Sequence, residues 1–508
     1  MSGVGVKVLE ETLLIRADAG AAMGTGHVMR CLALAQAWQD AGGQCVFVMA
    51  ESTPALERRL RDEGMKIQPL AVSAGSLQDA KQTKDIASEQ GVRWIVVDGY
   101  QFGAEYQQAI KSGGFKLLFV DDNVHAESYS ADLVLNQNMH ASASLYAKRE
   151  PYTRLLLGPR YAMLRRDFCG WRDWRRQISA SGRKILVTMG GSDPNNLTSR
   201  VIEAIRQVPT QDLETVVLLG GSNPHLQAVK AAIGADQRSM RLITDAENMA
   251  EWMAWADVAV AGAGTTFWEM CLLGLPSVLL VLAENQRGVA AAAEEMGLAC
   301  SLGDAAEASA PAIGSKLADL LNSYEKRSSQ SEKGRALVDG RGAERVLAFL
   351  SDLELRRTVV SDCDVFWEWA NDPDARAASF HHEPILWEDH VKWFRAKLSD
   401  PKAVFYTATN REGAPVGQVR YQIEGKRAVL SVSLGQRFRG CGWGRKILGI
   451  ATERLFQESE VEAIDAYVKP ANDASLKLFA GAGFQRLATE RIEGQEAVRF
   501  VLQRSRVA

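Results

Sequence analysis

The sequence has no apolar run long enough to cross a membrane, because no window approaches the roughly 20 uninterrupted apolar residues that a spanning helix needs. Acidic residues interrupt the apolar stretch near the N-terminus, and no small-residue cleavage signature follows it. These absences argue against a secretory signal and against membrane insertion. We therefore expect a cytoplasmic protein.

An excess of either charge is also lacking, since 59 Lys and Arg residues stand against 62 Asp and Glu residues. This balance predicts no nucleic-acid partner and no anionic membrane partner. The seven cysteines include no C-x-x-C pair and no Cys/His cluster with the spacing of zinc ligands. We expect no metal site and expect most cysteines to be reduced thiols in the core.

What the chain does have is length and a repeated pattern. Its 508 residues suffice for about three folding units. From residue 12 to about 350, runs rich in Val, Ile and Leu end at Gly or Asp and alternate with helical stretches, as in parallel sheets covered on both faces. The pattern starts again near residue 183, which predicts an α/β fold of two Rossmann-like lobes, residues 1–170 and 171–350. Ligands should bind between them, at the carboxyl ends of the strands.

A third domain is predicted over residues 351–508, where the pattern changes. A strand and two Trp-rich amphipathic helices precede antiparallel strands joined by Gly-containing turns. We expect an α+β domain with a mixed, largely antiparallel sheet.

The turn after the first strand carries Gly24, Thr25, Gly26 and His27 directly before an apolar helix. Glycines let backbone approach a ligand closely, and the amides at a helix N-terminus favour an anion such as a phosphate. His27 could accept a proton from water near neutral pH. The alternative is a buried or helix-capping histidine.

A longer string around this turn resembles the family of UDP-2,4-diacetamido-2,4,6-trideoxy-β-L-altropyranose hydrolases of pseudaminic acid synthesis. Its residues are Arg16, Asp18, Gly24, Thr25, Gly26, His27, Arg30 and Cys31. The resemblance covers roughly residues 12–350 and implies a glycosyltransferase-B-like fold. It also implies that Gly24, Gly26 and Arg30 contribute to binding of the UDP-sugar.

Other positions match this family and its glycosyltransferase relatives. Small residues after the first strand of the second lobe suit a diphosphate, namely Gly190, Gly191 and Ser192. Gly264 and Thr265 open a later helix, with Glu269 one turn in. In related transferases a glutamate so placed holds the ribose hydroxyls. The alternative for Glu269 is a first-turn acid that complements the helix dipole.

The mechanism implied by the resemblance is attack of water on the anomeric carbon, with inversion and release of UDP. His27 would be the general base, while Asn285 and Tyr100 would orient water and sugar and Gln286 would contact the substrate. The Gly-rich turns would stabilise charge on the leaving diphosphate. For the polar residues the alternative is an ordinary role in a turn or loop.

The third domain contains a second anion-binding motif. The string from Arg439 to Gly444 fits [QR]-x-x-G-x-[GA] between a strand and a helix, where successive amides form an anion cradle. With the later Asn472-x-x-Ser475, this motif resembles the GNAT superfamily of acetyl-CoA-dependent N-acetyltransferases over residues 352–504. The resemblance implies that the pyrophosphate of acetyl-CoA is bound by Arg437, Arg439, Gly440, Gly442, Gly444 and Arg445. It also implies that Asn472 reaches the pantetheine arm.

The motif departs from the superfamily at Phe479, where many members have a Tyr that protonates the leaving thiolate. The general acid is therefore left open between Tyr467, Ser475 and a water. A base role is conceivable for His381, His382 or Glu383, although a solvated turn is the simpler interpretation.

Together the two resemblances suggest a bifunctional enzyme of pseudaminic acid synthesis. It would acetylate the C4 amine of a UDP-4-amino-sugar and then hydrolyse the diacetamido product. One alternative is a UDP-sugar glycosyltransferase fused to an acetyltransferase. Another is a GNAT domain that only binds a nucleotide or a partner. Fusion would raise the effective concentration of the shared intermediate at its second site.

Overall fold

The computed structural model describes residues 11–20, 24–191, 193–221, 223–234, 239–244, 246, 248–350, 353–409, 413–439, 443–492 and 494–504. These residues fall into two compact units, one within residues 9–347 and the other within residues 348–508. The first unit contains two parallel sheets and the second contains one mixed sheet.

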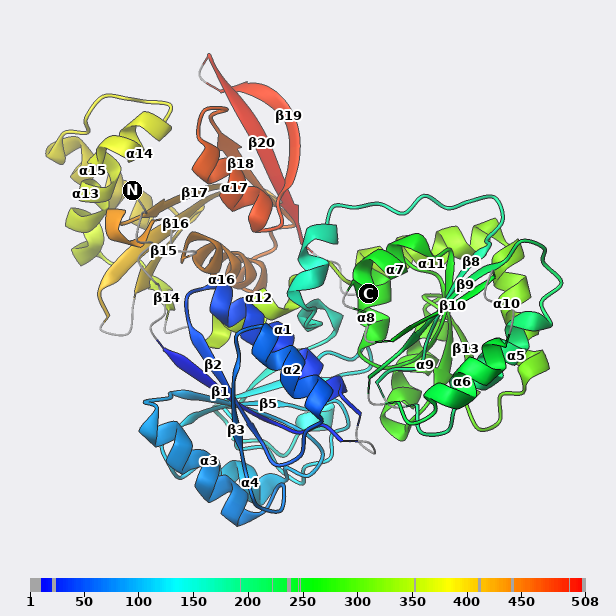
Figure 1. Ribbon diagram of the computed structural model, residues 1–508. Helices are drawn as coiled ribbons and strands as arrows, with labels where there is room; N and C mark the ends of the chain where they lie inside the picture. The colour runs from blue at the N-terminus through cyan, green and yellow to red at the C-terminus, as the bar shows by residue number, and fades with distance from the viewer. Residues whose placement is uncertain are drawn as a thin grey trace, which may run out of the picture. The chain divides into compact units, whose positions relative to one another are not determined.

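The first sheet has seven parallel strands in the order β3-β2-β1-β4-β5-β6-β7, with helices on both faces (Figure 1). The strands are β1 (Thr12–Ala17), β2 (Gln44–Met49), β3 (Lys66–Pro69), β4 (Trp94–Asp98), β5 (Lys116–Val120), β6 (Leu133–Asn136) and β7 (Arg154–Leu157). The helices are α1 (Gly26–Asp40), α2 (Pro54–Asp62), α3 (Leu77–Glu89) and α4 (Ala104–Lys111). The central strands are buried along nearly their whole length, which explains their continuous apolar sequences.

The second sheet has six parallel strands in the order β10-β9-β8-β11-β12-β13. They are β8 (Lys184–Thr188), β9 (Glu214–Leu219), β10 (Met240–Thr244), β11 (Val258–Gly262), β12 (Ser277–Val281) and β13 (Cys300–Asp304). The helices are α5 (Leu197–Arg206), α6 (Leu226–Ile233), α7 (Met249–Trp255), α8 (Thr266–Leu272), α9 (Arg287–Glu295), α10 (Ala310–Asn322), α11 (Tyr324–Leu337) and α12 (Gly342–Leu350). Alternate residues of these strands pack into two apolar clusters, one on each face of the sheet.

The third sheet has seven strands in the order β14-β15-β16-β17-β18-β20-β19 and is antiparallel except for the pair β17 and β18. The strands are β14 (Glu354–Arg357), β15 (Ala403–Thr409), β16 (Pro415–Glu424), β17 (Arg427–Leu434), β18 (Ala463–Val468), β19 (Gln485–Ile492) and β20 (Gln495–Gln503). The helices are α13 (Cys363–Asn371), α14 (Pro373–Ala378), α15 (Trp387–Ser399), α16 (Trp443–Glu458) and α17 (Asp473–Gly481). An apolar cluster joins α16 to this sheet, while aromatic residues of α13 and α15 form a smaller cluster against β15.

The predicted fold class is confirmed: two Rossmann-like lobes precede an α+β domain with a mixed sheet. The predicted lobe boundary near residue 170 lies in the connection between β7 and β8, which includes the short 3-10 helices Pro159–Tyr161 and Arg166–Trp171. Six cysteines among the described residues are free thiols, four of them buried. Within the described ranges no helix is both long and apolar enough to cross a membrane.

Candidate active sites

The turn between β1 and α1 presents His27 at the carboxyl end of the first sheet. Gly24 has a φ of 75°, a conformation that favours glycine, and α1 begins at Gly26. Thr25 precedes the helix without a capping hydrogen bond from its side chain, and the first turn contains no acidic residue. The N-cap side chain therefore accepts no hydrogen bond from the first amides of α1, which an anion site at this helix end requires.

His27 is buried and makes a strong contact with the end of β4. Its Nδ1 lies 2.7 Å from Oδ1 of Asp98 and 3.1 Å from Nη2 of Arg30. Because the carboxylate can only accept and the guanidinium can only donate, the shorter contact assigns the proton to Nδ1, which donates to Asp98. The same carboxylate accepts two hydrogen bonds of 2.6 Å from Arg30, one turn along α1. Burial opposes ionisation of Asp98, but the charges of Arg30 and His27 outweigh it and hold the pKa of Asp98 well below its usual range. This arrangement leaves Nε2 of His27 as the nitrogen that can accept a proton.

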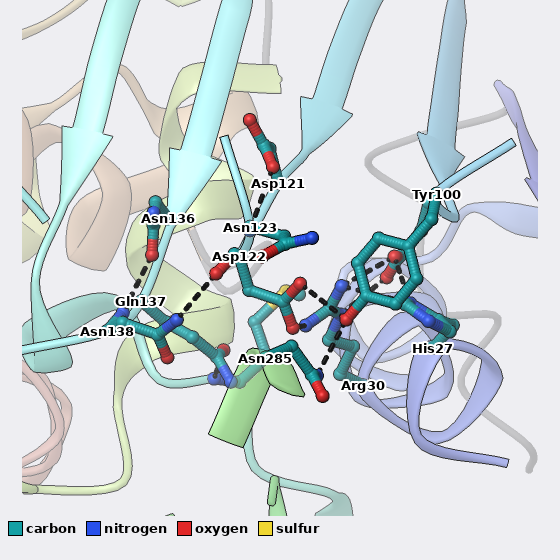
Figure 2. Close-up of polar contacts among 12 residues, drawn as sticks. His27, Arg30, Tyr100, Asp121, Asp122, Asn123, Asn136, Gln137, Asn138 and Asn285 are labelled. Atoms are coloured by element: carbon teal, nitrogen blue, oxygen red, sulfur yellow. Dashed lines mark hydrogen bonds and ion pairs between the residues drawn. The ribbon is translucent and has the colours of Figure 1, made fainter. Parts of the chain in front are cut away.

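Tyr100 and Asn285 meet beside this pair, although Tyr100 follows β4 of the first lobe and Asn285 lies in the short 3-10 helix Glu284–Gln286 of the second (Figure 2). The Nδ2 of Asn285 donates to the Tyr100 hydroxyl oxygen over 2.6 Å, and the hydroxyl donates to Oδ1 of Asp122 over 2.8 Å. The other oxygen of Asp122 accepts from Arg30. The imidazole of His27 packs edge-on against the Tyr100 ring, with centroids 4.8 Å apart. Three predicted catalytic residues, from three separate segments, thus lie together.

The hydroxyl of Tyr100 stays protonated. Burial and the negative charge of Asp122 raise its pKa far above the usual value. Its proton is directed at Asp122, so its oxygen can only accept from any further partner. Asn285 occupies that acceptor position in this structure.

Arg16 and Asp18, two residues of the resemblance, have a different environment. Both side chains are fully buried and paired at 2.6 Å, and Asp79 accepts from Nε and Nη2 at the other edge of the guanidinium. Asp18 also accepts from the backbone amides of Ala50 and Glu51. This network ties the loops after β1 and β2 to α3, which is a structural role behind the His27 turn.

In the second lobe, the predicted diphosphate turn lies opposite α1. Gly190 has a φ of 80°, and a Cβ on Gly191 would come 2.7 Å from Oγ1 of Thr25. The side chain of Asp193 caps α5 by accepting from the amides of Leu197 and Thr198. Ser192 lies outside the described residues. The absence of a side chain at Gly191 allows the two turns to approach.

Glu269 is buried in α8 and is paired with Arg165 of the first lobe. Both hydrogen bonds, of 3.0 and 3.2 Å, go to Oε1. Burial raises the pKa of Glu269, and Arg165 opposes part of that rise. Oε2 of Glu269 takes no part in this ion pair.

Gln286 and Gly264 lie side by side. The Gln286 Oε1 accepts from the amide of Leu282, and its Nε2 lies 3.4 Å from the position of a Cβ on Gly264. A Cβ on Gly26 would be 3.8 Å from Oγ1 of Thr265, so this helix start also faces α1. The second-lobe candidates therefore border the same region as His27.

The anion-binding motif of the third domain is described only in part. Gly440, Gly442 and the side chain of Arg437 lie outside the described residues. Arg439 donates to Asp372 over 2.6 Å and to the Leu434 carbonyl over 3.1 Å, so in this structure its guanidinium has protein partners. A Cβ on Gly444 would be 3.2 Å from atoms of Leu434 and Leu478, and Arg445 lies against Gly481.

Asn472 caps α17, where its Oδ1 accepts from the amide of Ser475 over 3.0 Å. Phe479 is buried and packs against Phe484 and Phe500, which shows that this position serves the core. Burial raises the pKa of Tyr467, the remaining tyrosine candidate for the general acid.

The loop after α14 holds the possible bases. His382 is exposed and its Nε2 lies 2.9 Å from Nζ of Lys469, an atom that can only donate. That nitrogen is therefore occupied as an acceptor. His381 and Glu383 are exposed residues of the same loop.

The sequence analysis identified Tyr100 but gave no role to Asp98, Asp122 or Arg165. A usable signal was present for two of them. Asp98 ends β4 and Asp122 follows β5, and the carboxyl ends of these neighbouring parallel strands meet at one edge of the sheet. Arg165 and its partner Glu269 are 104 residues apart in sequence, a contact that no local pattern records.

Two family models match the chain. The acetyltransferase (GNAT) domain matches residues 352–485, and the glycosyltransferase family 28 C-terminal domain matches residues 185–341. The first corresponds to the mixed-sheet domain and the second to the second parallel lobe.

Three curated proteins are similar over long stretches. The spore coat polysaccharide biosynthesis protein SpsG of Bacillus subtilis is 29% identical over 67% of this chain and 97% of its own length. An uncharacterised protein of Methanocaldococcus jannaschii is 22% identical over 93% of this chain and 96% of its length. The UDP-2,4-diacetamido-2,4,6-trideoxy-β-L-altropyranose hydrolase of Campylobacter jejuni is 25% identical over 55% of this chain and 94% of its length.

These matches agree with the resemblances predicted from the motifs. The chain is a fusion of a two-lobed region, similar to that UDP-sugar hydrolase and carrying a glycosyltransferase-28-like second lobe, with a C-terminal GNAT acetyltransferase domain.

Proposed function

We propose that the chain acetylates the C4 amine of a UDP-4-amino-sugar and hydrolyses the resulting UDP-2,4-diacetamido-2,4,6-trideoxy-β-L-altropyranose to UDP and the free sugar, two steps of pseudaminic acid synthesis. The proposed hydrolysis is supported above all by the buried His27–Asp98 pair beside the contact between Tyr100 and Asn285. The similarity to the Campylobacter jejuni hydrolase supports the choice of substrate.

In this proposal His27 is the general base. Its Nδ1 proton is held by Asp98, so Nε2 takes the proton from the attacking water. The buried cluster of Asp98, Asp122 and Arg30 carries one excess negative charge, which an imidazolium on His27 balances. The charge that develops on His27 during attack is therefore stabilised where it forms.

Tyr100 and Asn285 orient the reactants. The Tyr100 oxygen can accept a hydrogen bond from the water or from a sugar hydroxyl once Asn285 turns its amide toward the substrate. The amides of the turns at Gly24, Gly190 and Gly264 stabilise the departing diphosphate, and the free oxygen of Glu269 accepts from the ribose. The water and the anomeric carbon are thereby held in line for a direct displacement.

For the acetyl transfer, the mixed sheet fits an extended cofactor arm. β17 pairs with β18 only over Arg427–Val429, and both strands continue beyond that point. Among the described residues, those of β17 beyond Val429 therefore pair with no strand on this side, and their backbone groups can bind the pantetheine amides. Acetyl-CoA supplies the activated acetyl group, and the candidates for holding its pyrophosphate are the predicted residues from Arg437 to Arg445.

A second candidate is transfer of the sugar to an acceptor other than water. The match of residues 185–341 to a glycosyltransferase C-terminal domain favours it. The pair of His27 and Asp98 would then deprotonate an acceptor hydroxyl. Release of UDP in the absence of any acceptor distinguishes hydrolysis from transfer.

To test this, the purified chain is incubated with UDP-4-amino-4,6-dideoxy-N-acetyl-β-L-altrosamine, with and without acetyl-CoA. Mass spectrometry then measures the formation of coenzyme A and of UDP. The proposal expects coenzyme A first, then UDP and a free diacetamido sugar. An untouched sugar would refute the substrate. Acetylation without UDP release would refute the hydrolysis, and UDP release without coenzyme A would leave the GNAT domain as a binding module.

A further inference from the structure

Three consecutive amide side chains that the proposed mechanism does not use lie at the end of β6 and in the turn after it, namely Asn136, Gln137 and Asn138. Their residues are exposed by only 0%, 2% and 4%. A buried amide normally has all its hydrogen-bonding groups satisfied, because leaving one without a partner is costly.

Both polar groups of the Asn136 side chain are hydrogen-bonded within the protein. Its Nδ2 donates to the Tyr146 hydroxyl over 2.8 Å, and its Oδ1 accepts from the amide of Asn138 over 3.0 Å. It fixes the backbone from which the next two side chains project.

The orientation of the other two amides is set by backbone partners. The Oε1 of Gln137 accepts from the amide of Met163 over 3.2 Å, so its Nε2 is the remaining group. The Nδ2 of Asn138 donates to the Asp122 carbonyl over 3.1 Å, so its Oδ1 is the remaining group. Neither of these two atoms has a hydrogen-bond partner among the described residues. Neither is completely buried, so a ligand can reach both.

These two atoms lie at the candidate hydrolase site (Figure 2). Asn138 bonds the backbone of Asp122, whose carboxylate bonds Tyr100, which in turn bonds Asn285. Figure 2 draws Gln137 and Asn138 in the same group of polar residues as Asp122, Tyr100 and Asn285. The site thus contains one fixed donor and one fixed acceptor that the catalytic contacts leave unused.

We propose that Gln137 and Asn138 bind one acetamido group of the sugar and so select an N-acetylated substrate. A secondary amide carries one N–H donor and one C=O acceptor, which match the Oδ1 of Asn138 and the Nε2 of Gln137. This assignment rests on the proposed function, because it names the part of the UDP-sugar that the pair contacts.

The pair would disfavour the same sugar with a free amine. An ammonium group has donors only, so it can bind Asn138 but presents its charge to the N–H groups of Gln137. A site built to bond a group discriminates strongly against an analogue that leaves its buried partner unpaired. Hydrolysis would then follow acetylation, since the unacetylated sugar binds poorly.

The experiment measures binding by calorimetry in the full chain with His27→Ala, which prevents turnover in the proposed mechanism. The two ligands are UDP-sugars that differ only in acetylation of one amine. The His27→Ala chain that retains Gln137 should bind the acetylated sugar at least tenfold more tightly than the amine. Gln137→Glu keeps the acceptor for Met163 but turns the free donor into an acidic acceptor, so the preference should fall at least tenfold or reverse.

Two further variants guard against a trivial result. Gln137→Met removes both polar groups at similar length and should weaken binding of the acetylated sugar without gain for the amine. Gln107→Glu makes the same change at a buried glutamine whose Oε1 accepts from the amide of Ser130, and should leave the preference unaltered. Circular dichroism verifies folding in each case.

An unchanged preference in folded Gln137→Glu and Gln137→Met would overturn the proposal, as would equal binding of the two sugars by the His27→Ala chain. Failure of the proposed function is seen separately. In that case the unaltered chain releases no UDP from either sugar, whereas the binding preference still reports on Gln137 and Asn138.

Discussion

Asp98 accepts hydrogen bonds from two residues of α1, His27 and Arg30, and lies 3.4 Å from the thiol of Cys31. Because these partners hold its pKa well below the usual range, the carboxylate stays ionised throughout any practical assay. A loss of activity at low pH would therefore report on another group.

We predict that Asp98→Asn lowers the rate constant of UDP release roughly 10²- to 10⁴-fold, since an amide can favour the wrong tautomer of His27 and removes the charge that stabilises its cation. Steady-state kinetics checks this. Asp132→Asn is the matched control, because Asp132 is another paired carboxylate of the same lobe, held by Lys111 and Lys116. Activity equal to the control's would remove Asp98 from the mechanism.

His125 provides a prediction about pH. Its Nε2 lies 3.1 Å from the Phe102 carbonyl and its Nδ1 lies 3.3 Å from the Asp121 carboxylate, so both nitrogens face acceptors. Burial opposes the charged form, but the nearby carboxylate of Asp121 outweighs it and raises the pKa of His125. Because the folded-state pKa is raised, this stabilisation is present below the unfolded pKa and is lost as pH rises through the folded value.

The melting temperature of the chain should accordingly contain a component that falls as pH rises through the raised pKa of His125. In His125→Gln that component should be smaller, because the side chain no longer titrates. Calorimetric scans of both proteins across neutral pH measure the difference. Parallel pH profiles for the two would contradict the assignment.

At this scale the sequence predicted His27, Tyr100 and Asn285, because each belongs to a recognisable string. It gave no role to Asp122 or Asn138, whose importance comes from contacts with residues distant in sequence. Phe479 was noted as a departure, and only its packing explains it.

Among the elements, the C-terminal ends of α7 and α8 share one cation. Arg176 donates to the carbonyls of Met253, Ala256 and Leu273, and burial lowers its pKa to about 10. A positive charge at the carboxyl end of a helix satisfies terminal carbonyls and complements the helix dipole.

Replacing Arg176 with Met, which keeps the length but removes the donors, should lower the free energy of unfolding by about 2 kcal/mol. Arg175→Met, the exposed neighbour, should change it by less than about 0.5 kcal/mol. Urea denaturation measures both. Equal effects of the two changes would show that the carbonyl contacts do not stabilise the lobe.

The strands and helices of the two lobes could be predicted because buried parallel strands have continuous apolar sequences with polar ends. The separation of β17 from β18 beyond Val429 could not, since it depends on the register between strands distant in sequence. The proposed place of the cofactor arm depends on that separation.

At the scale of the whole molecule, two compact units carry the two proposed activities. The relative from Methanocaldococcus jannaschii aligns with 93% of the chain, so its match extends over both units. Length and the change of pattern near residue 350 were enough to predict separate domains, whereas the substrate of each depends on side chains that no composition records.

If the units act independently, His27→Ala should abolish UDP release while coenzyme A release stays within about twofold. Gly442→Glu, placed by the sequence motif alone, should block acetylation yet leave hydrolysis of an already acetylated UDP-sugar intact, because a side chain and a negative charge would fill the anion cradle. Loss of both activities in either folded variant would show that the units are coupled.

In the proposed hydrolysis, water attacks the anomeric carbon at the His27 site. The measurement is hydrolysis of the diacetamido UDP-sugar in oxygen-18 water, followed by mass spectrometry of the released UDP. We predict unlabelled UDP, since the bond between the anomeric carbon and the diphosphate oxygen breaks, and no release in His27→Ala. Oxygen-18 in the UDP would mean that water attacks phosphorus and would refute attack at the anomeric carbon.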